Sequence, residues 1–224
     1  MTRPNRLALF DCDGTLIDSQ HDIIAAMTHA FDAVRLERPS RKQILAVVGL
    51  SLPQAMARLV PQGEPAFHDH LAEQYKVGFR ALRAAGSVGE PLYPGIAELI
   101  ANLDAQGWML GVATGKSDRG LQICLTNHGL IDRFVTLQTA DRHPSKPNPA
   151  MAHAAMAEAG ATPETTVMIG DTSFDIHMAH NAGTRAIGVT WGYHSAKELR
   201  EAGAHAIAVD MDELARHITD HEHA

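Results

Sequence analysis

Short apolar runs, each ended by a polar turn, recur along the chain and predict the strands of a sheet. The first spans residues 7–10 and stops at an acidic turn that contains Gly14. Similar runs follow at residues 109–113, 135–137, 166–169 and 186–189. A run that is apolar at every position is typical of a strand buried on both faces of a parallel sheet. We therefore expect these five strands to form one mostly parallel sheet.

Amphipathic stretches of helical length lie between these runs. In residues 94–106 the apolar positions repeat with helical spacing, and Gly107 follows as a stop signal. The positions that form this apolar face are Ile96, Leu99, Ile100 and Leu103. Strands that alternate with helices predict an α/β fold built on a doubly wound parallel sheet.

The alternation stops between residues 17 and 89, where helical patterns occur without a buried strand. Two apolar stripes have helical spacing, one with Ile23, Met27, Phe31 and Val34 and one with Phe67, Leu71, Tyr75, Phe79 and Leu82. Ser40 with Gln43, and Ser51 with Gln54, have the spacing of capping boxes. We predict a helical cap domain at residues 17–89, inserted into a core domain of residues 1–16 and 90–224. The alternative is that these helices form extra layers of the main core.

Composition narrows the classes of function. The 224 residues are 45% hydrophobic and 20% charged, with a formal net charge of -7 and no long basic tract, so a nucleic-acid partner is not expected. No apolar run reaches the roughly 18 residues that a membrane span needs. Cys12 and Cys124 fit neither a disulfide framework nor a zinc site. We expect a cytoplasmic protein without a membrane partner.

The first candidate for chemistry is the acidic turn Asp11-Cys12-Asp13-Gly14-Thr15, which follows the first predicted strand. The carboxyl ends of parallel strands form the edge at which α/β proteins bind ligands. Two carboxylates two positions apart can divide the work, because one can attack or hold a metal while the other moves protons. Their closeness favours a bound divalent cation. The alternative is a solvated acidic turn.

A second acidic turn, Gly170-Asp171-Thr172-Ser173-Phe174-Asp175, follows the predicted strand at residues 166–169. Asp171 and Asp175 are spaced for a turn that leads into a helix. Hard carboxylate oxygens without nearby thiols suit Mg²⁺ better than zinc or copper. For Asp175, capping of the following helix is an equally good interpretation.

Two further positions fit the handling of a phosphoryl group. Thr114 ends the strand at 109–113, and Gly115 leaves backbone N–H groups accessible beside the hydroxyl. Lys146 precedes Pro147, and a lysine held by a rigid segment can offset the charge of a phosphate or of a nucleophilic carboxylate. Taken singly, a structural threonine and a surface lysine are the alternatives.

The order of these features resembles the haloacid dehalogenase (HAD) superfamily. The motifs that carry the resemblance are Asp11-Cys12-Asp13-Gly14-Thr15-Leu16-Ile17-Asp18-Ser19, Ala113-Thr114-Gly115-Lys116, Lys146-Pro147 and the turn from Gly170 to Asp175. They span nearly the whole chain and look like the phosphoglycolate phosphatase-like branch. The resemblance implies a HAD-like, Rossmannoid core with a helical cap inserted after the first motif.

The resemblance also implies a mechanism. Asp11 would be the nucleophile that becomes an aspartyl phosphate, and Asp13 the general acid and then the general base. Thr114, Gly115 and Lys146 would bind the phosphoryl group. The ligands of Mg²⁺ would be Asp11, the backbone carbonyl of Asp13 and Asp171, with Asp175 a ligand or a partner of one. The expected substrate is a small phosphorylated metabolite, with phosphoglycolate favoured.

Two other functions stay open at this point. A sugar phosphomutase of the same superfamily keeps both Asp11 and Asp13. A phospho-receiver module also gathers acidic residues, a threonine and a lysine around an aspartyl phosphate, but it is about half as long and lacks a cap. Within the predicted cap, the turn at residues 48–51 is the segment that we expect to face the leaving group. Oligomeric state is not predicted.

Overall fold

The computed structural model describes residues 4–220, so the ends of the predicted core domain, 1–3 and 221–224, lie outside the described residues. Six strands form one sheet in which every neighbouring pair is parallel, in the order β3-β2-β1-β4-β5-β6. The strands are β1 (Asn5–Phe10), β2 (Met109–Thr114), β3 (Thr136–Thr139), β4 (Ala161–Gly170), β5 (Arg185–Val189) and β6 (Ala206–Ala208). This arrangement confirms the predicted doubly wound parallel sheet.

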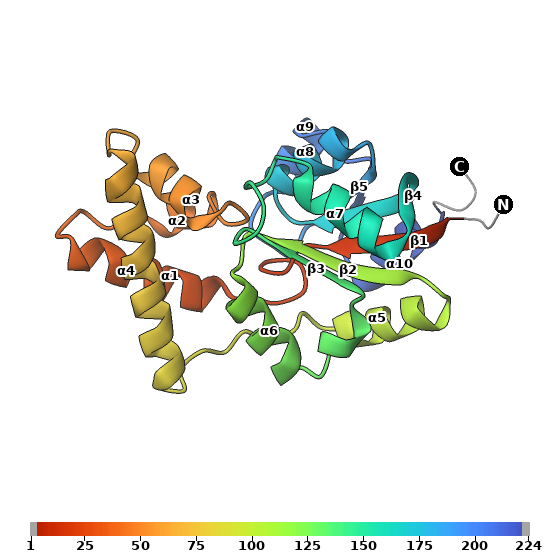
Figure 1. Cartoon of the computed structure of the whole chain (residues 1–224), viewed down its shortest axis with the longest axis horizontal. Helices are drawn as coiled ribbons and strands as arrows, with labels where there is room; N and C mark the ends of the chain where they lie inside the picture. The colour runs from red at the N-terminus through yellow and green to blue at the C-terminus, as the bar shows by residue number, and fades with distance from the viewer. Residues whose placement is uncertain (1–3, 221–224) are drawn as a thin grey trace.

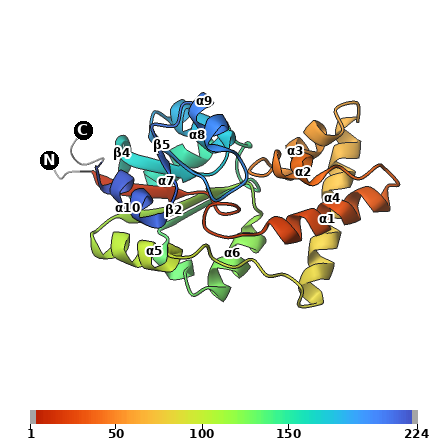
Figure 2. The same ribbon diagram turned by 180° about the vertical axis from the view of Figure 1, so that it is seen from behind.

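Helices cover both faces of the sheet (Figures 1 and 2). One face packs against α5 (Ile96–Ala105), α6 (Asp118–Asn127) and α10 (Met211–Thr219), with a short 3₁₀ helix η1 (Ile131–Arg133) after α6. The other face packs against α7 (Ala150–Ala159), α8 (Ser173–Ala182) and α9 (Ala196–Glu201). Successive side chains of a strand point to opposite faces, so Ala8 and Phe10 of β1 belong to the first apolar cluster and Leu7 and Leu9 to the second.

Four helices between β1 and α5 lie together beyond the edge at which β1 ends (Figure 1). These are α1 (Gln20–Ala33), α2 (Arg41–Leu45), α3 (Leu52–Leu59) and α4 (Pro65–Ala84), here called the helical group. They share an apolar cluster that includes Ile23, Met27, Phe31, Met56 and Leu71. The predicted domain boundaries at 16/17 and 89/90 stay a prediction, which this separate cluster supports.

Two connecting segments, residues 11–19 and 85–95, join the helical group to the sheet. They lie side by side, because Ile17 pairs with Leu92 in an isolated β-bridge. A second apolar cluster spans the junction, with Val47, Leu50 and Ala55 of the helical group against Phe174 of α8. The position of the helical group over the carboxyl edge of the sheet is therefore supported by packing as well as by the chain connections.

Several local predictions need correction. β6 is a sixth strand that the sequence pattern missed, because its three residues are too short to form a recognisable apolar run. The third strand begins at Thr136, and Val135, predicted inside it, is 53% exposed. α5 begins at Ile96 instead of residue 94, since Gly95 has a φ of 89° and cannot be part of the helix.

The two predicted capping boxes have different outcomes. Ser40 and Gln43 form the reciprocal bonds at the start of α2, as predicted. The box at Ser51 and Gln54 is wrong: the Ser51 side chain makes no capping hydrogen bond at the start of α3. The Ser51 backbone N–H instead donates to Ser145 Oγ at 2.8 Å, a contact between the helical group and the loop before α7. A distant hydrogen bond has replaced a local one.

No helix within residues 4–220 is both long and apolar enough to cross a membrane.

Candidate active site

The sheet order places the two acidic turns next to each other. β1 and β4 are neighbours, and the connections after them lead to opposite sides of the sheet, which makes their carboxyl ends a topological switch point. Asp11 directly follows β1, and Asp171 directly follows β4. The Asp11 backbone N–H donates to the Ile169 carbonyl at 2.8 Å, so the parallel pairing continues up to the site.

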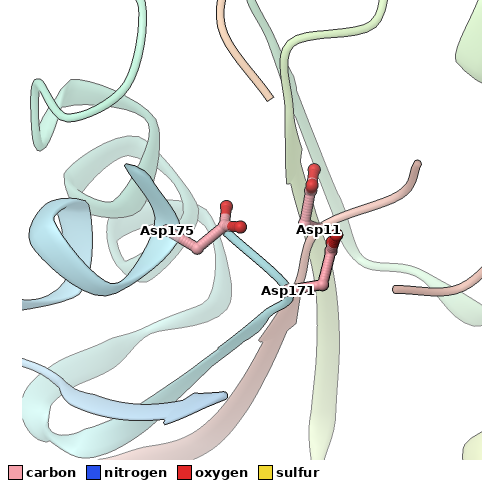
Figure 3. A group of neighbouring side chains, drawn as sticks. All are labelled: Asp11, Asp171 and Asp175. Atoms are coloured by element: carbon pink, nitrogen blue, oxygen red, sulfur yellow. The ribbon is translucent and has the colours of Figure 1, made fainter. Parts of the chain in front are cut away.

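Three buried carboxylates converge at this point. One oxygen from each of Asp11, Asp171 and Asp175 lies within 4.8 Å of the other two, and Figure 3 shows the three side chains turned toward a common region. The turn at Gly14 allows this approach: its φ is 92°, and a Cβ there would lie 2.3 Å from Asp171 Oδ2. Hereafter these three residues are called the acidic cluster.

Lys146 lies inside the protein next to the acidic cluster, although it is 25 positions from Asp171, 29 from Asp175 and 135 from Asp11 in the sequence. Its Nζ is 2.8 Å from Asp11 Oδ1 and 2.6 Å from Asp175 Oδ1, and its side chain is 0% exposed. A fully buried lysine is stable only when paired with anions. The alternative of a lone surface lysine is excluded by this geometry.

Asp175 has partners for both of its oxygens. Oδ1 accepts from Lys146, while Oδ2 accepts from the backbone N–H and the hydroxyl of Thr172. Thr172 and Asp175 together form a capping box at the start of α8. The capping role that the sequence left open for Asp175 is therefore real, and Asp175 also anchors Lys146.

Asp171 and Asp11 differ in how their oxygens are bonded. Asp171 Oδ1 accepts from the Thr15 hydroxyl at 2.8 Å and Oδ2 from the Tyr193 N–H at 2.9 Å, so the orientation of this carboxylate is fixed. Asp11 is paired with Lys146 through Oδ1. Its Oδ2 is buried and has no hydrogen-bond partner among residues 4–220. A buried oxygen without a donor is rare in folded proteins, and here it belongs to a carboxylate beside a cluster of other carboxylates.

The electrostatics of the cluster follow from its burial. Burial raises the pKa of Asp11 to about 7, with Lys146 limiting the rise and Asp175 adding to it. Burial, together with Asp175 and Asp11, also holds the pKa of Asp171 well above its ordinary value. Burial alone lowers the pKa of Lys146, but the two carboxylates outweigh burial and raise it. When all three carboxylates are ionised, the single ammonium of Lys146 leaves an excess negative charge that a cation would relieve.

Asp13 is not part of the acidic cluster and has a separate set of partners. Its Oδ1 accepts from the Ser19 hydroxyl at 2.6 Å and from Lys116 Nζ at 2.8 Å. Lys116 also pairs with Glu90 at 2.7 Å. Ser19 and Lys116 belong to the motifs quoted above, but the sequence analysis assigned no function to either. Glu90 was not identified as a site residue, because no motif or local pattern connects it to the acidic turn.

A cavity of about 720 Å³ opens between the sheet edge and the helical group. Asp11, Asp13, Thr114 and Gly115 line it, whereas Lys146, Asp171 and Asp175 do not. The four lining residues can therefore contact a molecule in the cavity, while the other three lie close to Asp11 without lining it. A Cβ on Gly115 would lie 2.6 Å from the Leu50 carbonyl oxygen, so the turn at 48–51 meets the loop after β2 at this point.

The far wall of the cavity belongs largely to the helical group. Its apolar part includes Ile23, Met27, Val48, Leu50 and Leu52. Arg80 of α4 and Arg119 of α6 also line the cavity, and neither forms a hydrogen bond or ion pair with another residue of the described chain. An anionic group in the cavity would therefore find two guanidinium groups that have no hydrogen bond or ion pair within residues 4–220.

The chain is similar to known hydrolases and phosphatases over most of its length. A family model described as haloacid dehalogenase-like hydrolase matches residues 8–189. A probable phosphatase IndB of Dickeya dadantii is 35% identical over 93% of this chain and 91% of its own length. A phosphoglycolate phosphatase of Vibrio vulnificus is 29% identical over 93% of this chain and 94% of its own. The crystal structure of a predicted phosphatase from Clostridium acetobutylicum superposes with a TM-score of 0.87 and 26% identity, covering 98% of this chain and 100% of that one.

These similarities extend over the sheet, the helical group and both acidic turns, and they confirm the resemblance drawn from the motifs. Because the family model covers far more than half of the chain, the chain belongs to the haloacid dehalogenase-like hydrolase family.

Proposed function

We propose that this protein is a Mg²⁺-dependent phosphatase that transfers the phosphoryl group of a small phosphorylated metabolite to Asp11 and then to water. The observation that carries the proposal is Asp11 itself, which lines the cavity and has a buried Oδ2 without a hydrogen-bond partner in residues 4–220. Such an oxygen is free to bond to phosphorus. The phosphatases among the similar proteins support the same reaction.

The acidic cluster suits a magnesium ion by its chemistry. Carboxylate oxygens are the hard ligands that Mg²⁺ prefers, and the cluster has more negative charge than Lys146 can balance. We assign the ion to Asp11, Asp171 and the backbone carbonyl of Asp13. Asp175 would be a further ligand or would support the site through Lys146, which pairs with its Oδ1. When bound, the ion would offset negative charge on the transferring phosphoryl group.

Asp11 and Asp13, which both line the cavity, have different roles in the two chemical steps. In the first step a carboxylate oxygen of Asp11 attacks phosphorus, the bond from phosphorus to the leaving oxygen breaks, and Asp13 gives that oxygen a proton. In the second step Asp13 takes a proton from water, the water oxygen attacks phosphorus, and the bond to Asp11 breaks. Thr114 and the Gly115 N–H are assigned to the phosphoryl oxygens in both steps. Lys146 does not line the cavity but pairs with Asp11, so it would contact the phosphoryl group once that group is bonded to Asp11.

The arginine side chains that line the cavity indicate the kind of leaving group. A small metabolite that carries a second anion would place its phosphate against Asp11 and its anion against Arg80 and Arg119. Phosphoglycolate has this chemistry, and it is the substrate named for the Vibrio vulnificus relative. We therefore infer a phosphoglycolate-like substrate, with an alcohol oxygen as the leaving group and a carboxylate nearby.

The proposal is tested by measuring phosphate release from p-nitrophenyl phosphate and from phosphoglycolate. We expect turnover in Mg²⁺ and a loss of at least about a hundredfold after EDTA, restored by added Mg²⁺. Full activity in metal-free buffer would contradict the proposal. Transfer to a sugar phosphate with little free phosphate would indicate a phosphomutase instead.

A second measurement addresses the covalent step. Asp13→Asn should still accept a phosphoryl group from p-nitrophenyl phosphate, because its leaving group needs little protonation, but should lose the base for hydrolysis. Mass spectrometry should then detect one added phosphoryl group. Asp11→Asn is the matched control, since it keeps the shape of the side chain but removes the nucleophile, and it should acquire none.

A further inference from the structure

The ammonium group of Lys116 connects Asp13 to a residue far from the acidic turns. Nζ lies 2.8 Å from Asp13 Oδ1 and 2.7 Å from Glu90 Oε1. The side chains of Lys116, Asp13 and Glu90 are 9%, 12% and 6% exposed. Charged hydrogen bonds with so little exposure to water are strong and fix the orientation of the groups that they join.

Glu90 lies in the second connecting segment, which leads from α4 back to the sheet. Its φ is 36°, a conformation that non-glycine residues rarely adopt. Two backbone contacts hold it there: its N–H donates to Asp22 Oδ2 at 3.4 Å, and its carbonyl accepts from His128 Nε2 at 2.8 Å. Asp22 belongs to α1 and His128 follows α6, so Glu90 is fixed by the helical group and by the sheet domain together.

The helix α4 holds the other side of this connection. Arg83 Nη2 donates to Glu90 Oε2 at 3.0 Å. The ring of Phe79 faces Lys116, with 5.7 Å between Nζ and the ring centroid. Because Arg83 and Phe79 belong to α4, a movement of the helical group relative to the sheet would displace the ammonium group that pairs with Asp13.

We propose that Glu90 is a positioning residue for Asp13 and acts through Lys116. Glu90 fixes the ammonium group, which in turn fixes the Asp13 carboxylate toward the cavity. Ser19 also donates to Asp13, but the part of its orientation that Lys116 supplies depends on where the helical group lies. This inference rests on the proposed role of Asp13 as acid and base, and it adds a link between the position of the cap helices and that role.

The proposal is tested by the dependence of kcat/KM on the leaving group, because a poor leaving group needs a proton from Asp13 and a good one does not. The variant is Glu90→Gln, which keeps the shape of the side chain but removes its charge. We expect kcat/KM to fall about tenfold to a hundredfold for an alkyl phosphate but less than about threefold for p-nitrophenyl phosphate. A merely structural role would lower both values equally, and that result would overturn the proposal.

A double-mutant cycle tests whether the effect passes through Lys116. If it does, Glu90→Gln combined with Lys116→Met should be no worse for the alkyl phosphate than Lys116→Met alone. Additive losses would show that Glu90 acts by another route and would refute the proposal. Asp32→Asn is the control, since it removes an exposed ion pair with Arg38 at the end of α1 and should change neither substrate.

Two further variants distinguish a failure of this inference from a failure of the proposed function. Arg83→Gln removes the other partner of Glu90 and should shift leaving-group dependence in the same direction, even if Glu90→Gln fails to fold. Thermal unfolding of each variant monitors folding. Asp13→Asn should itself increase leaving-group dependence. If it does not, the proposed proton transfer fails; if it does and neither Glu90→Gln nor Arg83→Gln follows, only the present inference fails.

Discussion

Lys146 and Lys116 each bridge two carboxylates, but they connect different parts of the molecule. Lys146 pairs with Asp11 and Asp175, is 0% exposed, and joins residues that the sheet and α8 hold rigidly. Lys116 pairs with Asp13 and Glu90, is 9% exposed, and reaches the connecting segment that leads to the helical group. The local chemistry is the same in both cases, while the elements that fix the lysine differ.

The difference separates the two parts of the proposed reaction. The ion pairs of Lys146 join Asp11 and Asp175, which both belong to the sheet domain, so we expect the attack of Asp11 on phosphorus to depend less on the helical group. Groups around Lys116 include Glu90, which Arg83 of α4 also contacts. We therefore expect proton transfer by Asp13 to depend on the position of the helical group. The following predictions test this contrast, beginning with the largest effect.

Lys146→Met should cause the largest loss. We expect kcat to fall about a thousandfold for good and poor leaving groups alike, because the phosphoryl group loses a cationic partner. The free energy of unfolding should fall by about 3–5 kcal/mol, since Asp11 and Asp175 stay buried without their counterion. Steady-state kinetics and urea unfolding measure the two effects. A loss restricted to poor leaving groups would remove the contrast between the two lysines.

Lys116→Met should have a smaller and selective effect. We expect kcat/KM to fall about tenfold to a hundredfold for an alkyl phosphate and to change less than about threefold for p-nitrophenyl phosphate. The reason is that Asp13 loses the ammonium that orients it, while Asp11 and Lys146 keep their geometry. The measurement is a comparison of substrates with graded leaving groups. Equal losses for all of them would show that Lys116 also binds the phosphoryl group.

Arg80→Gln should affect substrate preference without affecting the chemical steps. We expect kcat/KM for phosphoglycolate to fall about tenfold, while ethyl phosphate, which lacks the carboxylate, stays within about twofold. Competition between the two substrates gives the ratio directly. Arg216→Gln, on α10 and away from the cavity, is the control and should leave the ratio unchanged. A fall for both substrates would place the carboxylate site elsewhere.

Cys12→Ser should have the smallest effect, with kcat within about twofold of the unmodified protein. Cys12 stands between Asp11 and Asp13 in sequence, but its side chain belongs to the apolar cluster on one face of the sheet. A hydrogen bond with Cys124 and burial hold the pKa of Cys12 well above its ordinary value, so the thiol is a poor nucleophile. Loss of activity with an intact fold, measured by circular dichroism, would indicate a thiol mechanism.

Much of the fold could be predicted because its signals are local. The run at residues 7–10 is apolar on both faces, and the structure buries it between two layers of helices. The stripe of Ile23, Met27 and Phe31 became the buried face of α1. The failures had two different causes: β6 is too short to detect, and the Ser51 backbone N–H donates to Ser145, 94 positions away. No pattern within a window of the sequence can indicate such a bond.

The sequence by itself determined which residues stand at the ends of β1, β2 and β4, because the apolar runs stop there and polar residues follow. It therefore identified Asp11, Thr114 and Asp171 as neighbours at one sheet edge. Only the tertiary structure decided how their partners are arranged. Lys116 meets Asp13 across 103 positions, and Lys146 is fully buried against Asp11 and Asp175. Hydrophobic periodicity fixes the ends of elements, whereas these ion pairs depend on strand order and on the placement of the helical group, which arise only when the whole chain packs.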